Sequence, residues 1–414
     1  MSWRRHLPAA LRRRDYALLW AVTIFTGVAL QMVGVAVGWQ VYAIHRDPFD
    51  LGLIGLMEFV PLPLLALPAG QLSDRVSRRV VIAVSIVLDT TVVLLLVVVT
   101  LAGARQLWPF LLLAAATGVS ASIGWPALRA LPPVLVPMEL LPSAMALRSI
   151  AFQAATVAGP ALGGILFVIR PVTVYATAAA LCAVSFVCAL ALRVPPPETR
   201  EVEPLGWTSA LAGIRFIRRT PMLLGAISLD LFAVLFGGAV ALLPVFARSI
   251  LHTGPIGLGV LRSAPAVGAI VAGVWLTRRP MQRHAGHTLL VVVAAFGISM
   301  VVFGLSHSLA LSLVALAVSG FADMISMNIR GTTVAVATPD ALRGRVLAVE
   351  MVFISASNEL GAFESGVAAA LLGTVTAVVA GGAITIGLAA SWLKLFPSLA
   401  HVDRLEDVAA VEAV

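Results

Sequence analysis

Long apolar runs separated by short charged segments dominate this chain of 414 residues. A hydrocarbon core about 30 Å thick needs about 20 apolar residues per helix, and most of the runs exceed about 18. The alternating strands of about ten residues that a transmembrane barrel needs are absent from the pattern. The pattern therefore predicts an all-α integral membrane protein with twelve transmembrane helices. The predicted spans are 17–42, 51–72, 80–101, 107–128, 140–169, 171–192, 222–251, 257–276, 287–305, 309–338, 342–372 and 374–396.

The composition excludes most other classes of protein. Hydrophobic residues make up 60% of the chain and charged residues 12%, whereas soluble chains are usually about half apolar and about a quarter charged. The two cysteines, Cys182 and Cys188, suggest neither a disulfide framework nor a thiolate site, and the seven histidines show no ligand spacing. Neither a nucleophile-base arrangement nor a phosphate loop stands out. We therefore expect no metal, no cofactor and no enzymatic activity.

The formal charge of +8 comes almost entirely from arginines in the short loops. Such a charge in a soluble protein would suggest nucleic acid, but here its placement indicates topology. Arginines are frequent before the first span and in the even-numbered loops, and sparse in the odd-numbered ones. By the positive-inside rule, both termini lie in the cytoplasm of a protein of the inner membrane. The first apolar stretch is too long for a cleaved signal peptide.

One polar interruption, 193–221, is longer than the others and divides the spans six and six. Within it Trp207, Ala210, Leu211, Ile214 and Ile217 recur at helical spacing, which predicts a short amphipathic helix on the cytoplasmic membrane face. The polar tail is expected to be disordered. The predicted parts are a cytoplasmic segment 1–15, a six-helix bundle 16–192, the linker 193–221, a second six-helix bundle 222–396 and a cytoplasmic tail 397–414.

The two halves read as a diverged repeat. Leu51-Gly52-Leu53 is echoed by Ile256-Gly257-Leu258, and Gly159 and Gly164 are echoed by Gly361 and Gly366. The matches share an offset of about 202–205 positions, counted along the printed sequence. Duplicated halves with a substrate site between them are a common plan among transporters.

A charged motif lies between the second and third spans: Gly70-Gln71-Leu72-Ser73-Asp74-Arg75-Val76-Ser77-Arg78-Arg79. Gly70 permits close approach of helices. Asp74 is an acid within a basic turn, and such a cluster can hold one conformation and release it in another. The alternative is a plain positive-inside turn, but that rule does not call for the acid. Arg129, at the end of the fourth span, is a candidate partner for Asp74.

This stretch resembles the cytoplasmic signature of the major facilitator superfamily, Gly-x-Leu-x-Asp-Arg-x-x-Arg-Arg. Ser77 stands where the signature has a glycine. In the second half Thr277 stands where the acid would be, followed by Arg278 and Arg279. The resemblance therefore implies a gating motif that depends mainly on Asp74, with Gly70, Arg75, Arg78, Arg79 and Arg129 around it.

A narrower resemblance covers most of the chain and points to the enterobactin-exporter-like branch, which is similar to siderophore, macrolide and other drug exporters. It implies twelve helices, alternating access, proton antiport and a monomer. The stretches that carry it are Trp125–Pro137, Ala144–Leu147, Gly159–Gly164, Arg343–Val346 and Ser357–Gly366.

Gly159-Pro160 has a physical interpretation as well, because proline removes a helix hydrogen bond and bends the helix. A similar glycine-proline motif lies in the fifth span of drug antiporters. The alternative is an ordinary kink without a role in transport.

Ionisable residues at membrane depth are costly and by default suggest function. Glu350 and Arg330 lie close to the ends of their spans and are expected to snorkel towards water. Asp89 is either paired or in contact with a wet crevice. The full set is Glu58, Asp89, Arg148, Asp230, Arg262, Asp323, Arg330, Glu350, Glu359 and Glu364.

Four acids, Glu364, Asp230, Asp323 and Glu359, lie deeper and are the candidates for proton coupling. A low dielectric favours the neutral form of an acid, so that the group can load and release a proton near neutral pH. Glu359 and Glu364 lie about 140° apart around one helix and should not share a face. We favour Glu364 or Asp230 as the carrier. The alternative for each is an acid satisfied by an arginine or by backbone.

The substrate cavity should lie near the midplane between the halves. Amide side chains would supply hydrogen bonds, and aromatic rings would form an apolar wall. For each ring, the alternative is ordinary packing or lipid contact. The candidates are Gln31, Trp39, Gln153, Phe236, Asn328 and Asn358.

We therefore expect a secondary active transporter that exports small amphipathic molecules, drug-like or siderophore-like, by proton antiport. The expected partners are substrate, protons and membrane lipids, with no nucleic acid. The alternatives are a lipid or lysolipid flippase on the same scaffold and a membrane sensor that does not transport.

Overall fold

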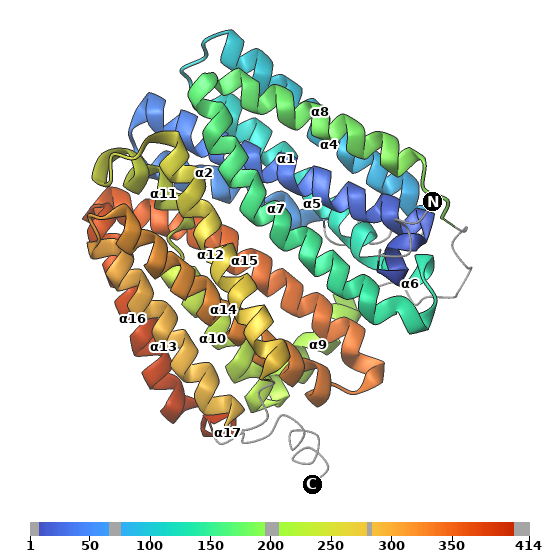
Figure 1. Cartoon of the computed structure of the whole chain (residues 1–414). Helices are drawn as coiled ribbons and strands as arrows, with labels where there is room; N and C mark the ends of the chain where they lie inside the picture. The colour runs from blue at the N-terminus through green and yellow to red at the C-terminus, as the bar shows by residue number, and fades with distance from the viewer. Residues whose placement is uncertain (1–7, 66–75, 195–206, 280–283, 401–414) are drawn as a thin grey trace. The chain divides into compact units, whose positions relative to one another are not determined.

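The computed structural model describes residues 8–65, 76–194, 207–279 and 284–400, and helices are the regular secondary structure of these ranges (Figure 1). Twelve of its helical segments are long and apolar enough to cross a membrane, which confirms the predicted fold. The α-helices are α1 (Arg14–His45), α2 (Pro48–Phe59), α4 (Arg78–Leu101), α5 (Trp108–Ala130), α6 (Pro132–Leu135), α7 (Leu141–Ile169), α8 (Pro171–Leu190), α9 (Trp207–Arg219), α10 (Pro221–Gly237), α11 (Leu243–Val245), α12 (Gly254–Arg278), α13 (Ala285–Leu305), α14 (Leu309–Ala337), α15 (Asp340–Leu372), α16 (Thr374–Leu395) and α17 (Pro397–Ala400).

The spans differ from the predicted ones mainly at their ends. The second span begins earlier than predicted, at Pro48, and is described as far as Leu65; its predicted continuation to residue 72 lies outside the described ranges. The fourth span continues to Leu135 because α6 follows α5 directly. The seventh combines α10 with η4 (Val240–Leu242), α11 and the π-helical turn η5 (Phe246–Ile250).

The chain divides into two compact units. The first contains Met1–His45, Met57–Pro204 and Gly254–Ser263, and the second contains Arg46–Leu56, Leu205–Thr253 and Ala264–Val414. The beginnings of α2 and α12 thus belong to the unit formed mainly by the other half of the sequence. The predicted bundles 16–192 and 222–396 are separated only at the linker, whereas each of these units includes a segment from the other half of the sequence. The predicted bundle boundaries therefore remain a prediction.

In the first unit, α1 packs against α7 and α8, and α4 packs against α5 and α8 (Figure 1). Polar groups inside this bundle find partners on neighbouring helices. The indole of Trp20 donates to the Leu147 carbonyl at 2.9 Å, and the hydroxyl of Tyr175 donates to Gln40 Oε1 at 2.8 Å. Such pairing is what a bilayer requires of buried polar groups.

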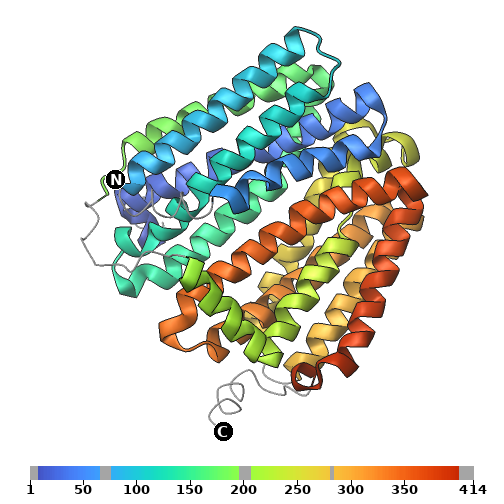
Figure 2. The same ribbon diagram turned by 180° about the vertical axis from the view of Figure 1, so that it is seen from behind.

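In the second unit, α13 packs against α14 and α16, and α10 packs against α15 and α16 (Figure 2). The indole of Trp392 on α16 donates to the Gly225 carbonyl on α10 at 2.9 Å. These contacts hold α10 and α15 together, and both helices carry acids that were singled out from the sequence.

The paired glycines have equivalent neighbours in the two units. In the first unit Gly159 lies against Gln31 of α1, and Gly164 lies against the carbonyl of Pro255 at the start of α12. In the second unit Gly361 lies against Leu235 of α10, and Gly366 against Gly52 at the start of α2. The repeat read from the sequence therefore corresponds to a repeated set of helix contacts.

The amphipathic helix predicted in the linker is present as α9, and it packs against α10 and α15. Ile217 is 3% exposed and joins a core with Leu223, Ile227 and Val346. At this position the apolar face therefore covers protein rather than lipid. The side chains of Trp207 and Ala210 lie outside the described part of the chain.

The expectation of a disordered tail is wrong for its first four residues, which form α17. Leu399 is 2% exposed and belongs to the core of the second unit, so burial of one leucine accounts for the short helix. Residues 401–414 lie outside the described ranges.

Candidate functional site

A buried ion-pair cluster in the second unit joins α10, α14 and α15. The guanidinium of Arg330 pairs with the Asp230 carboxylate through Nη1, and its Nε lies 3.5 Å from Glu350 Oε1. Asp230, Arg330 and Glu350 are 8%, 3% and 7% exposed. Acids on α10 and α15 thus depend on one arginine of α14 to neutralise their charge.

The expectation that Arg330 and Glu350 would snorkel to water is wrong. Arg330 lies about two turns and Glu350 about three turns along its helix from the loop at Thr338–Pro339. Both are nevertheless buried, because α10 brings Asp230 to the same level and the arginine binds there instead.

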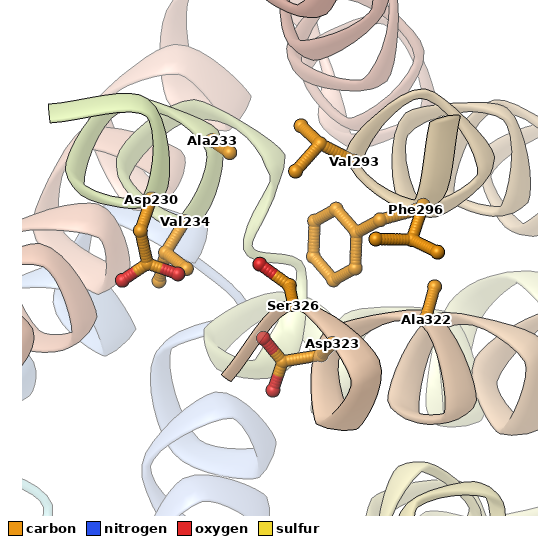
Figure 3. A pocket seen from close by; sticks show the side chains of 9 residues that line it. Asp230, Ala233, Val234, Val293, Phe296, Ala322, Asp323 and Ser326 are labelled. Carbon is orange, nitrogen blue, oxygen red and sulfur yellow. The ribbon is translucent and has the colours of Figure 1, made fainter. Parts of the chain in front are cut away.

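Asp323 completes the cluster from one wall of a small pocket (Figure 3). The pocket lies between α10, α13 and α14, with Asp230 on one side and Asp323 and Ser326 on another. Val293 and Phe296 of α13 close it with apolar surface. Its free space is about that of a single water molecule, so in this conformation it suits a proton or a water rather than a drug-sized ligand.

The cluster holds more acid than Arg330 can neutralise. Asp323 interacts electrostatically with both Asp230 and Arg330, and Glu350 interacts with Asp230 as well as with Arg330. One guanidinium therefore stands against three carboxyl groups. Like charges held together at low dielectric do not all ionise, and protons are the simplest compensation for the excess.

The other two proton-coupling candidates, Glu359 and Glu364, lie further along α15 and are half-buried. Next to Glu364, the hydroxyl of Ser365 donates to the Gly238 carbonyl at 2.7 Å. Gly238 is where α10 ends inside the seventh span, so this bond supplies a partner to a carbonyl that the interrupted helix leaves open. Glu364 thus lies beside a helix break rather than in the arginine cluster.

The predicted substrate-cavity residues fall in both units. In the first unit Gln31 donates to Thr156 Oγ1 at 3.5 Å, Gln153 is half-buried and Trp39 is buried. In the second unit Phe236 stacks on Phe232 with ring centroids 6.4 Å apart, and Asn328 and Asn358 are exposed. Their role in a shared cavity stays a prediction.

The gating motif is described in part. Gly70, Asp74 and Arg75 lie outside the described ranges. Arg78 Nη1 donates to the Ala130 carbonyl at 2.9 Å and so ties the start of α4 to the end of α5, next to the exposed Arg129. Arg79 is half-buried at the same helix start. The kink pair Gly159 and Pro160 is buried within α7.

A second acidic pocket, in the first unit, received little weight in the sequence analysis. Asp89 on α4 is 5% exposed and lines a pocket with Thr26, Ser85 and Ser120. The sequence signal for this pocket was the presence of hydroxyl residues in spans near Asp89. These residues lie on three separate helices, α1, α4 and α5, so the sequence alone did not bring them together. Within the described ranges, no three His, Cys, Asp or Glu side chains form a group that could hold a metal ion.

Comparison with known proteins adds a family and a fold. The family profile described as transmembrane secretion effector matches residues 7–411. The chain is 27% identical over 400 residues to the enterobactin exporter EntS of Citrobacter koseri, and the match spans 94% of this chain and 93% of that one. It is 26% identical over 385 residues to the enterobactin exporter EntS of an Escherichia coli strain, spanning 91% and 89%.

Solved structures share the fold at low identity. A bacterial homologue of the iron transporter ferroportin in an inward-facing state matches with a TM-score of 0.69 and 18% identity, covering 95% of this chain and 100% of that one. A POT family transporter in complex with 5-aminolevulinic acid matches with a TM-score of 0.74 and 12% identity, covering 94% and 97%.

Proposed function

The chain belongs to the transmembrane secretion effector family of major facilitator superfamily transporters, and from this membership we propose that it exports small amphipathic molecules by proton antiport. The relatives named above export enterobactin, so a catecholate siderophore or a molecule of similar size and polarity is the proposed cargo. The proposed setting is the inner membrane, with both termini in the cytoplasm and the protein working as a monomer.

The acid excess around Arg330 carries the proposal of proton coupling. A proton that binds the cluster cancels one negative charge and weakens the hold of one carboxylate on the guanidinium. Arg330 can then shift its pairing between Asp230 on α10 and Glu350 on α15. Because a buried charge needs a partner, proton binding and release would favour different arrangements of these helices, as alternating access requires.

The coupled unit is the cluster rather than one residue. Strongly interacting acids share their protons, so a titration belongs to the group as a whole. Asp230 and Asp323 are the members that line the pocket, so we assign proton exchange to these two. Glu350 and Arg330 position the charge, and Glu359 and Glu364 become the less favoured carriers.

The test is transport in liposomes that contain the purified protein, under an imposed pH gradient. Catecholate siderophores, macrolides and lipophilic dyes form the panel. We expect gradient-dependent movement that Asp230→Asn or Asp323→Asn reduces at least tenfold. Glu139→Gln is the matched control, because Glu139 is an exposed acid outside the cluster. Movement indifferent to the gradient would contradict proton antiport and point to facilitated flux, and movement of labelled lipids alone would point to flipping.

The gating motif remains part of this proposal. If Asp74 locks one conformation, Asp74→Asn should abolish transport while the protein still reaches the membrane in normal amount. Unchanged transport would remove Asp74 from the mechanism and leave the acid cluster unaffected.

A further inference from the structure

The pocket around Asp89 lies among α1, α4 and α5 of the first unit. Polar side chains from all three helices line it: Thr26 from α1, Ser85 and Asp89 from α4, and Ser120 from α5. The pocket has room for a small number of water molecules. A carboxyl group is therefore kept at membrane depth beside several hydroxyls in an otherwise largely apolar pocket.

Three hydroxyl groups around Asp89 have backbone carbonyls as hydrogen-bond acceptors. Ser120 Oγ donates to the Ser85 carbonyl at 2.9 Å, Ser85 Oγ donates to the Ile82 carbonyl at 2.9 Å, and Thr117 Oγ1 donates to the Leu113 carbonyl at 3.1 Å. A hydroxyl has one proton to donate and two lone pairs. These three hydroxyls thus have carbonyl acceptors of their own, and the indole of Trp125 is a further donor in the lining of the pocket.

Ser120 is the side-chain hydrogen-bond partner of Asp89. The single hydroxyl proton of Ser120 can be given either to Asp89 or to the Ser85 carbonyl, which it reaches at 2.9 Å, so it is shared between two acceptors. The Asp89 side chain is 5% exposed, and a carboxylate removed from water without a cation beside it is unfavourable at low dielectric. The burial of the group therefore fits a protonated Asp89.

The surroundings supply no compensating cation among the residues that line the pocket. From α8, the titratable group that faces Asp89 is the thiol of Cys182, which is fully buried. From α1 and α5 the lining side chains are hydroxyls, apolar groups, a glycine and the indole of Trp125, and Arg129 follows the last of them, Leu128, as an exposed residue. Burial in such surroundings favours the neutral form of the acid.

The repeat relates this pocket to the acidic pocket of the second unit. Thr26, Leu30 and Asp89 each lie 204 positions before a residue of that pocket, namely Asp230, Val234 and Val293. The same interval relates α1, α4 and α5 to α10, α13 and α14 as their counterparts in the second unit. Each unit thus has a small pocket with a carboxyl group at equivalent helices, and the acids lie on different helices of the two sets.

We propose that Asp89, with Ser120 as its hydrogen-bond partner, is a second proton-binding site, the counterpart in the first unit of the Asp230–Asp323 pocket. Proton binding here does not depend on the transport proposal. It requires that the carboxyl be neutral in this conformation and release its proton when water or a conformational change reaches the pocket.

The test is infrared spectroscopy of the reconstituted protein during a pH titration, which reads the carbonyl stretch of protonated carboxylic acids. We expect Asp89→Asn to remove one component of the wild-type signal, whereas Glu139→Gln leaves every buried component in place. Asp230→Asn should remove a different component. An Asp89→Asn spectrum identical to that of the wild type at every pH would overturn the proposal.

Two further arms keep the test decisive. Ser120→Ala retains the acid but removes its partner, so the Asp89 component should shift in frequency; this arm applies even if Asp89→Asn does not fold. Replacing choline chloride with sodium chloride at constant pH should change nothing. Loss of the component on adding sodium would show a sodium site and overturn the assignment to protons. The assay uses neither cargo nor gradient, so its result is separate from that of the transport experiment.

Discussion

Arg330 holds two acids from two other helices, and its environment explains why a cation is stable there. At 3% exposure the guanidinium has almost no contact with solvent, so its charge is balanced by Asp230 and Glu350. A paired buried charge contributes little net stability, but breaking such a pair leaves an uncompensated charge and is strongly destabilising. The cluster is therefore sensitive to the removal of any one member.

We predict that Arg330→Met lowers the free energy of unfolding by about 3–5 kcal/mol at neutral pH, the range seen when one partner of a buried pair is lost. The loss should shrink as the pH falls, because protonated acids no longer need the cation. Thermal unfolding in detergent across pH measures this. Arg218→Met, at an exposed position of α9, is the matched control.

Adding Asp230→Asn to Arg330→Met should restore part of the stability, since the acid left without its partner is removed as well. An effect of Arg330→Met no larger than that of Arg218→Met, or one that does not vary with pH, would contradict the ion-pair cluster.

Some of these residues could be predicted and others could not. Asp230 and Asp323 were found as deep acids because their distance from the span ends follows from the sequence. Arg330 and Glu350 were misplaced because closeness to a helix end does not reveal which neighbour covers the side chain. The hydroxyls around Asp89 come from three separate helices, so their convergence needed the structure.

At the scale of the elements, small residues set the distance between helices. A Cβ on Gly164 would lie 2.5 Å from the Pro255 carbonyl oxygen, and a Cβ on Gly366 would lie 2.6 Å from the Gly52 Cα. Both contacts bring backbone against backbone, where neither side can move away at low cost. The matching spacing of Gly159 and Gly164 and of Gly361 and Gly366 was readable from the sequence, but the partners of Gly164 and Gly366, the starts of α12 and α2, were not.

We therefore predict that Gly164→Ala and Gly366→Ala each reduce the yield of monodisperse protein and its melting temperature. Gly387→Ala is the matched control, because the space around Gly387 is open and alanine is the better helix former by about 1 kcal/mol. Size-exclusion chromatography and thermal unfolding read both properties. Equal behaviour of the three variants would show that these contacts are looser than described.

At the scale of the whole molecule, the twelve spans followed directly from hydropathy, because a bilayer leaves few alternatives to long apolar helices. The assignment of one segment from each half to the other unit could not be predicted from hydropathy. Nothing in the local sequence assigns Arg46–Leu56 or Gly254–Ser263 to the opposite half. Orientation still rests on the arginine bias.

Orientation can be tested with single cysteines in a Cys182→Ala/Cys188→Ala background. His307→Cys, in the exposed loop between α13 and α14, should react with an impermeant maleimide in intact cells. Gly344→Cys, in open space near the start of α15, should react only after the membrane is permeabilised. The reverse pattern would place the termini outside the cytoplasm.

The most direct test of the central claim, that the Arg330 cluster exchanges protons for cargo, is proton movement driven by cargo alone. Liposomes containing the protein and an internal pH indicator receive a gradient of a transported molecule with no initial pH gradient. The account predicts that wild-type protein moves protons against the direction of the cargo, and that Asp230→Asn with Asp323→Asn abolishes this movement while Glu139→Gln does not. Cargo flux without proton flux in the wild type, or proton flux that persists in the double variant, would contradict it.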